Sequence, residues 1–141
     1  MPKIIRNGVF ETNSSSSHSI VFPEKALDKS QWNIHYTADI FEVSGSGEYG
    51  WGYDSYNSLI SKIDYLIVEI ESNPNRQYYA DKIKRVFEQY TNATLNITFD
   101  GGGYIDHQSY GTAMRVLDGD DDHLARYMFD PEVTLIIDSD G

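Results

Sequence analysis

The chain has 141 residues, with 22 acidic and 11 basic side chains and a formal net charge of −11. This length fits one domain, residues 1–141, and the 40% hydrophobic and 13% aromatic content allows a packed core. The acidic balance disfavours non-specific binding to nucleic acid or to an anionic membrane. The absence of cysteine excludes disulfides and thiolate zinc sites.

The N-terminal sequence MPKIIRNGVF contains Lys3 and Arg6 but no apolar run long enough for a signal peptide. No segment approaches the roughly 18 apolar residues that a membrane helix requires. We therefore expect a cytoplasmic protein with no membrane partner.

The N-terminal third favours short strands. A strand is expected over Lys3–Arg6 and another over His18–Phe22, ended by Pro23. Residues 24–32 fit a short helix or turn, and residues 34–43 fit one or two strands. Residues 44–54, with four glycines, predict a loop, a bulged hairpin or an irregular strand.

The middle of the chain predicts two helices. Apolar residues recur at helical spacing over 56–71, with Asp54 or Ser55 as the expected N-cap. Asn73, as N-cap, and Pro74, at the first helical position, predict a second helix that reaches Tyr90. We expect these helices to form a hairpin on one face of a sheet.

The C-terminal third predicts further strands. Residues 94–99 alternate between apolar and polar, and residues 100–102 are a turn signal, so residues 103–107 are expected to pair with them. A short helix is expected over 120–129 and a last strand over 133–137, while residues 108–117 fit no single element. The whole predicts an α+β domain, with a mixed or antiparallel sheet of four to six strands and two main helices on one face.

A serine tract directly precedes the expected strand at His18. Consecutive hydroxyl and backbone N–H groups can hold phosphate oxygens without positive charge, and a histidine can add a hydrogen bond or act as an acid or base. The alternative is an exposed loop whose hydroxyls cap its own backbone. We expect residues 13–17 to hold the phosphates, with Arg6 as a charged partner and His18 to fix orientation. The expected ligand-binding residues of this part of the chain are Arg6, Glu11, Asn13, Ser14, Ser15, Ser16, Ser17 and His18.

The segment YIDHQS and the acidic C-terminus are a second candidate. Asp106 and His107 face opposite ways on a strand, so one of them could reach His18. Asp138 and Asp140 lie two residues apart. Together with Asp106, His107, His18 and Glu11 they could hold Mg²⁺ or Mn²⁺. The alternatives are a surface strand end and a solvated tail.

Aromatic side chains alternate through the glycine-rich stretch GEYGWGYD. Trp51 or Tyr53 could stack on a nucleobase, or these rings could pack against the sheet or a second subunit. The aspartates at 118 and 120–122 do not have EF-hand spacing and indicate a helix start.

The opening from Arg6 to Ser19 resembles a largely uncharacterised family of small bacteriophage and mobile-element proteins that begin R-x-x-V-F-E-T-N-S-S-S-[ST]-H-S. The segments GWGYD, YIDHQS and the final Asp-x-Asp are also similar to that family. The resemblance implies phage origin and implies that these separated motifs meet in space. Small acidic phage proteins are often counter-defence factors, so by analogy with that class we expect a counter-defence role.

Three functions follow as hypotheses. The first is a phage protein that binds a phosphate-containing small ligand, such as a nucleotide immune signal, as a homo-oligomer in the host cytoplasm and without a cofactor. The second is a metal-dependent phosphodiesterase or nucleotide hydrolase, with His18, Asp106 and His107 as catalytic residues. The third is an acidic inhibitor that occupies the nucleic-acid cleft of a host defence enzyme.

Overall fold

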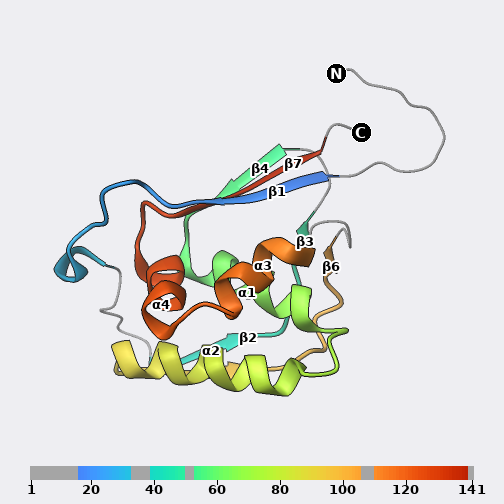
Figure 1. Cartoon of the computed structure of the whole chain (residues 1–141). Helices are drawn as coiled ribbons and strands as arrows, with labels where there is room; N and C mark the ends of the chain where they lie inside the picture. Colours follow the sequence, from blue (N-terminus) through green and yellow to red (C-terminus); the bar gives the residue numbers. More distant parts are fainter. Residues whose placement is uncertain (1–15, 33–38, 50–52, 106–109, 140–141) are drawn as a thin grey trace.

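The computed structural model describes residues 16–32, 39–49, 53–105 and 110–139, and within these ranges the chain has an α+β fold, as expected. The strands of the described residues form three small sheets rather than one larger sheet. In Figure 1 a three-stranded sheet covers one side of helices α1, α3 and α4, and helix α2 lies on their other side with strand β2.

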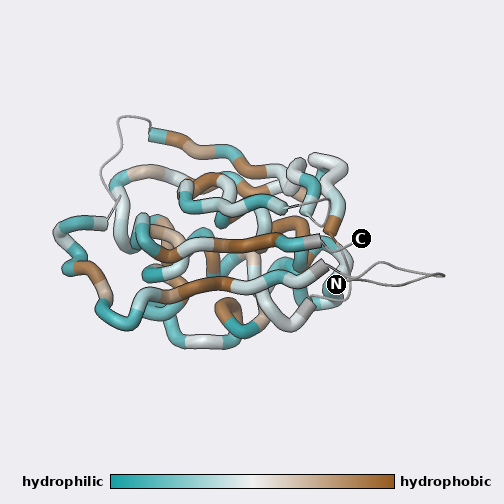
Figure 2. Tube along the Cα trace, turned by 90° about the horizontal axis from the view of Figure 1, so that it is seen from above, coloured by the Kyte–Doolittle hydropathy of each residue, from teal (hydrophilic) through white to brown (hydrophobic). Residues whose placement is uncertain are grey.

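The three-stranded sheet joins the two ends of the described chain to its middle. Strand β7 (Thr134–Ser139) lies between β1 (Ser16–Val21) and β4 (Tyr53–Tyr56), and both pairings are antiparallel. Leu135 and Ile137 turn into the core, since both are almost fully buried. Figure 2 shows hydrophobic stretches in β1 and β7, whereas β4 is mostly hydrophilic.

Helix α1 (Leu59–Ile70) is the central element of the core, and Ile63, Leu66 and Ile67 are completely buried. Its N-cap is Ser58, whose hydroxyl accepts a hydrogen bond from the Ser61 N–H, and not Asp54 or Ser55. Those two residues belong instead to β4, which ends two residues before the cap.

Helix α2 (Arg76–Tyr90) follows a short turn, and its N-cap is Asn75 rather than the expected Asn73. The Asn73 side chain accepts from the Asn75 N–H, so this asparagine organises the turn instead of the first helical turn. Both predicted helices form. The three-stranded sheet lies on one side of α1, whereas α2 lies on the other side of α1 and packs against β5.

Two parallel pairs complete the sheets. Strand β2 (Ile40–Val43) pairs with β5 (Thr94–Ile97), and β3 (Glu48–Tyr49) pairs with β6 (Tyr104–Ile105). The expected hairpin between residues 94–99 and 103–107 is wrong within the described residues. After Gly102, which has a φ of +71°, residues 103–104 donate backbone hydrogen bonds to the carbonyls of Gly45 and Gly47 instead.

Two shorter helices precede the last strand. Helix α3 (Tyr110–Leu117) occupies the segment for which the sequence favoured no element. Helix α4 (Asp121–Phe129) confirms the expected short helix, and the Asp120 carboxylate caps it by accepting from the His123 N–H. A single 3-10 turn, η2 (Lys29–Gln31), lies in the segment expected to be a short helix or turn.

No helix among the described residues is both long enough and apolar enough to cross a membrane. The expected strand at residues 3–6, and the part of residues 34–43 before Asp39, lie outside the described ranges.

Candidate functional site

A pocket of about 280 Å³ lies where strand β1 meets helices α3 and α4. We call it the β1–α3 pocket. Residues from all three elements line it, and they are polar, basic and apolar in nearly equal measure: His18, Ser19, Ile20, Phe22, Thr112, Arg115, Val116 and His123.

The free edge of β1 forms one wall of this pocket. The Thr112 hydroxyl donates a hydrogen bond of 3.0 Å to the His18 carbonyl, which attaches α3 to the strand. In an antiparallel strand, every second residue directs its N–H and C=O to the same edge. The N–H and C=O of Ile20 therefore point to the same edge of β1 as the His18 carbonyl. The pocket therefore contains backbone polar groups as well as side chains.

The His18 side chain lies under the sheet, where it is buried. Its Nδ1 is 2.9 Å from the Tyr65 hydroxyl on α1. Burial, with a further contribution from the charge of Glu69, raises the pKa of the Tyr65 phenol, so this phenol stays protonated at neutral pH. The pair fixes the orientation of the imidazole at the inner wall of the pocket.

Phe22, another residue of the pocket lining, is in contact with two side chains of α4. The His123 ring stacks on the Phe22 ring at 4.6 Å, and the Arg126 guanidinium lies 5.3 Å from the same ring. Arg126 also donates to the Pro23 carbonyl and pairs with the buried Asp130 carboxylate at 3.4 Å. Arg126 is thus held in place by its own partners.

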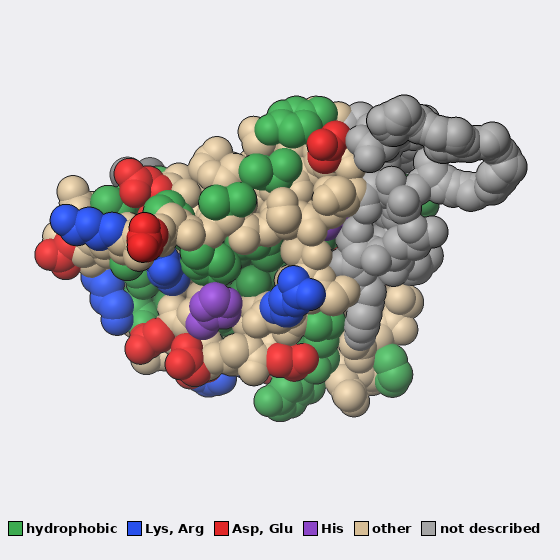
Figure 3. Space-filling view, turned by 45° about the horizontal axis from the view of Figure 1, so that its top comes forward, with side chains coloured by type: hydrophobic (Ala, Val, Ile, Leu, Met, Phe, Trp, Pro, Cys, Tyr) green, Lys and Arg blue, Asp and Glu red, His purple; other side chains and the backbone are tan. Residues whose placement is uncertain are grey.

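Arg115 is exposed and has no acidic partner among the described residues. Some basic groups elsewhere in the described chain do have such partners, for example Arg85 with Asp121 at 2.6 Å. Others, such as Lys25 and Arg76, form no ion pair with a described carboxylate either. On the face shown in Figure 3, a histidine and a basic side chain lie near each other, and acidic side chains lie along one side of them. An unneutralised guanidinium beside a pocket is a suitable anchor for an anion.

Part of the predicted site forms a row across the outer face of the three-stranded sheet. Ser17 pairs with Asp138, and Tyr53 pairs with Asp138 on the other side. Ser17 and Asp138 are exposed, and Tyr53 is 65% exposed. The register therefore brings together three residues that lie far apart in the sequence.

The same register separates His18 from Asp138. His18 pairs with Ile137 on the buried face, whereas Asp138 lies on the outer face. These two side chains cannot ligate one ion without leaving their strands. Ser16 begins β1, and the described residues contain no group of three or more acidic or histidine side chains arranged to hold a metal.

The other predicted site residues lie outside the described ranges. They are Arg6, Glu11, Asn13, Ser14, Ser15, Trp51, Asp106, His107 and Asp140.

Part of the glycine-rich stretch is buried in the core. Tyr49 is buried, and its hydroxyl donates to the Asp64 carboxylate at 2.8 Å. Burial and the neighbouring Asp64 charge raise the pKa of the Tyr49 phenol. Of the aromatic residues in this stretch, Tyr49 packs in the core, while Tyr53 is open to solvent.

Sequence reasoning missed Thr112, Arg115 and His123. Thr112 and Arg115 are three residues apart and share one face of α3, but the helix itself was not predicted. The acidic run before His123 indicated only a helix start.

Comparison with known proteins gives no match: no protein-family model, no curated protein and no solved structure is significantly similar to this chain.

Proposed function

We propose that this protein binds a small phosphate-bearing ligand, with the anionic group in the β1–α3 pocket. The observation that carries the proposal is Arg115, a guanidinium without an acidic partner among the described residues, beside a pocket in a chain of net charge −11.

The pocket offers hydrogen-bond donors of the kinds that phosphate requires. Arg115 has a planar set of N–H groups that can pair with two phosphate oxygens. The ring of His123 also lines the pocket, whereas the hydroxyl of Ser19 lies on the outer face of β1, like that of Ser17. The Thr112 hydroxyl already donates to the His18 carbonyl, so its remaining role is to hold α3 in place.

The size of the pocket limits what it can enclose. At about 280 Å³ it is slightly below the usual range of roughly 300–1,000 Å³ for whole small-molecule sites. A phosphate group and the atoms next to it fit this space, and the rest of a nucleotide would extend along the surface. We therefore propose that the ligand bearing this phosphate group is a nucleotide, including a nucleotide immune signal of a phage host.

Phage origin and a counter-defence role belong to the same proposal, and they depend on the resemblance of residues 6–19. The hydrolase alternative is less favoured, because His18 and Asp138 lie on opposite faces of the sheet.

Isothermal titration calorimetry tests this proposal. Inorganic phosphate, pyrophosphate, AMP and a cyclic dinucleotide are titrated into the full chain and into Arg115→Gln. We expect saturable binding of at least one nucleotide, weakened by roughly tenfold or more in Arg115→Gln, since hydrogen bonds to charged groups contribute about 1.5–3 kcal/mol each.

The matched control is Lys25→Gln, which removes the same charge from an exposed side chain outside the pocket. Equal weakening by both variants would show a non-specific charge effect and contradict the assigned site. Absence of heat with every ligand, from protein shown to be folded by circular dichroism, would overturn the proposed function itself.

A further inference from the structure

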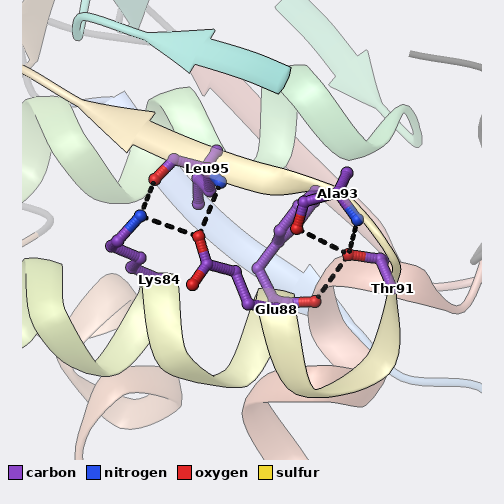
Figure 4. Close-up of polar contacts among 6 residues, drawn as sticks. Lys84, Glu88, Thr91, Ala93 and Leu95 are labelled. Atoms are coloured by element: carbon purple, nitrogen blue, oxygen red, sulfur yellow. Dashed lines mark hydrogen bonds and ion pairs between the residues drawn. The ribbon is translucent and has the colours of Figure 1, made fainter. Parts of the chain in front are cut away.

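Helix α2 covers part of the free edge of strand β5. The Leu95 N–H donates to the Glu88 carboxylate at 2.9 Å, and the Leu95 C=O accepts from the Lys84 ammonium at 2.8 Å (Figure 4). Lys84 and Glu88 also pair with each other at 2.7 Å. At this residue the two side chains take the hydrogen-bonding positions of a neighbouring strand.

Two residues further along, the same edge is open. Thr94 and Thr98 donate their N–H groups to β2, so the odd-numbered residues of β5 direct their backbone groups away from β2. Ile97 is such a residue. Within the described chain its N–H and C=O make no hydrogen bond, although Leu95 before it makes two.

The open position lies in a groove of about 910 Å³ between α2 and β5, which we call the α2–β5 groove. Its charged lining is mainly acidic: Glu42, Asp81 and Asp100. The single lysine of the lining, Lys84, is already bound to Glu88 and to the Leu95 carbonyl. The groove thus combines an unused backbone donor and acceptor with uncompensated negative charge.

We propose that the α2–β5 groove binds a short, extended, lysine- or arginine-rich segment of a partner protein. One residue of that segment would exchange backbone hydrogen bonds with Ile97, as in β-strand addition. Its side chains two residues apart would reach carboxylates such as Asp81 and Asp100. Charge complementarity selects this occupant, because an acidic segment would be repelled.

This inference is independent of the anion pocket, which is built from β1, α3 and α4 and shares no lining residue with the groove. A failure of either proposal leaves the other intact.

Fluorescence anisotropy with a labelled synthetic peptide, acetyl-Lys-Val-Arg-Val-Lys-Val-amide, tests the inference at low and high salt. We expect saturable binding that weakens with salt, and a loss of roughly tenfold or more in affinity for Asp81→Asn combined with Asp100→Asn. The same charge change outside the groove, Glu24→Gln combined with Glu132→Gln, is expected to change affinity by less than about twofold.

The backbone contact has its own test. A peptide that is N-methylated at its central residues keeps its charge but cannot exchange strand hydrogen bonds, and we expect it to bind at least about tenfold more weakly. In ¹H–¹⁵N spectra the Ile97 amide is expected to shift on addition of the unmodified peptide. Equal binding of the methylated peptide, an unchanged Ile97 amide, or equal loss in both pairs of variants would overturn the proposal.

Discussion

Lys62 is a completely buried lysine on α1. Its ammonium donates to the carbonyls of Asp130 and Val133 at 3.0 and 3.1 Å, where α4 ends and the chain enters β7. Burial lowers the pKa of this ammonium to about 8, although the charge of Asp130 acts in the opposite direction. A buried lysine thus joins the core helix to the turn between α4 and β7.

This lowered pKa predicts a pH dependence of stability. Between pH 8 and the ordinary lysine pKa of 10.5, the unfolded chain binds more protons at this position than the folded chain, so stability rises with pH. We expect the Lys62 contribution to increase by about 1 kcal/mol from pH 7.5 to 9. Urea unfolding of the natural chain and of Lys62→Met measures it as the difference between their pH profiles.

Lys25→Met is the control, because this lysine is exposed. Parallel pH profiles of the natural chain and Lys62→Met would refute the assigned pKa. The comparison ends at pH 9 because burial also raises the pKa values of the Tyr65 and Tyr127 phenols. Near and above pH 10 these phenols lose their protons in the unfolded chain first, so their contribution to stability falls as the pH rises.

Asp64 provides a second residue-scale prediction. Its carboxylate accepts the Ser46 N–H at 3.0 Å, the Gly47 N–H at 2.8 Å and the Tyr49 hydroxyl. We expect Asp64→Asn to lower the free energy of unfolding by about 2 kcal/mol or more, because the amide loses the charge and one acceptor. Asp81→Asn, at an exposed position, is expected to cost less than about 0.5 kcal/mol; similar losses in denaturant unfolding would contradict the role of Asp64.

At the scale of elements, the edge of β5 depends on α2. We expect Glu88→Ala to lower stability by about 1–2 kcal/mol, since the Leu95 N–H loses its acceptor. Hydrogen exchange at the Leu95 amide should become faster in that variant. Gln89→Ala, the next position on the same helix, is exposed and should leave both quantities unchanged; unchanged exchange in Glu88→Ala would show that the carboxylate does not protect the edge.

The elements that the sequence predicted correctly are those with a local signal. The apolar stripe of α1 and the acidic start of α4 lie within single segments, and both helices form as expected. The β3–β6 pair was not predictable in this way. Its strands are parallel and joined by more than 50 residues, and the turn signal at residues 100–102 indicated a local hairpin instead.

The residues of the candidate site also differ in whether a local sequence signal identifies them. His18 was identified because a serine tract and a strand pattern adjoin it. Thr112, which bonds to its carbonyl, is 94 residues away, and only the packing of α3 on β1 brings the two together. Arg115 enters the pocket through the same packing, and His123 enters it because α4 lies next to Phe22. The sequence has no local signature for either contact.

On the scale of the whole molecule, two regions of the described surface differ in charge. A chain of net charge −11 keeps an unpaired guanidinium at the β1–α3 pocket and carboxylates at the α2–β5 groove. The two regions would select ligands of opposite sign: an anion at the first and a cationic segment at the second.

A ¹H–¹⁵N NMR titration of the full chain with AMP tests the central claim most directly, because it locates binding as well as detecting it. We predict saturable shifts of the Ile20, Thr112, Arg115 and His123 amides, and their loss in Arg115→Gln. Saturable shifts confined to other parts of the chain, or none at any AMP concentration that leaves the protein folded, would contradict an anion site in the β1–α3 pocket.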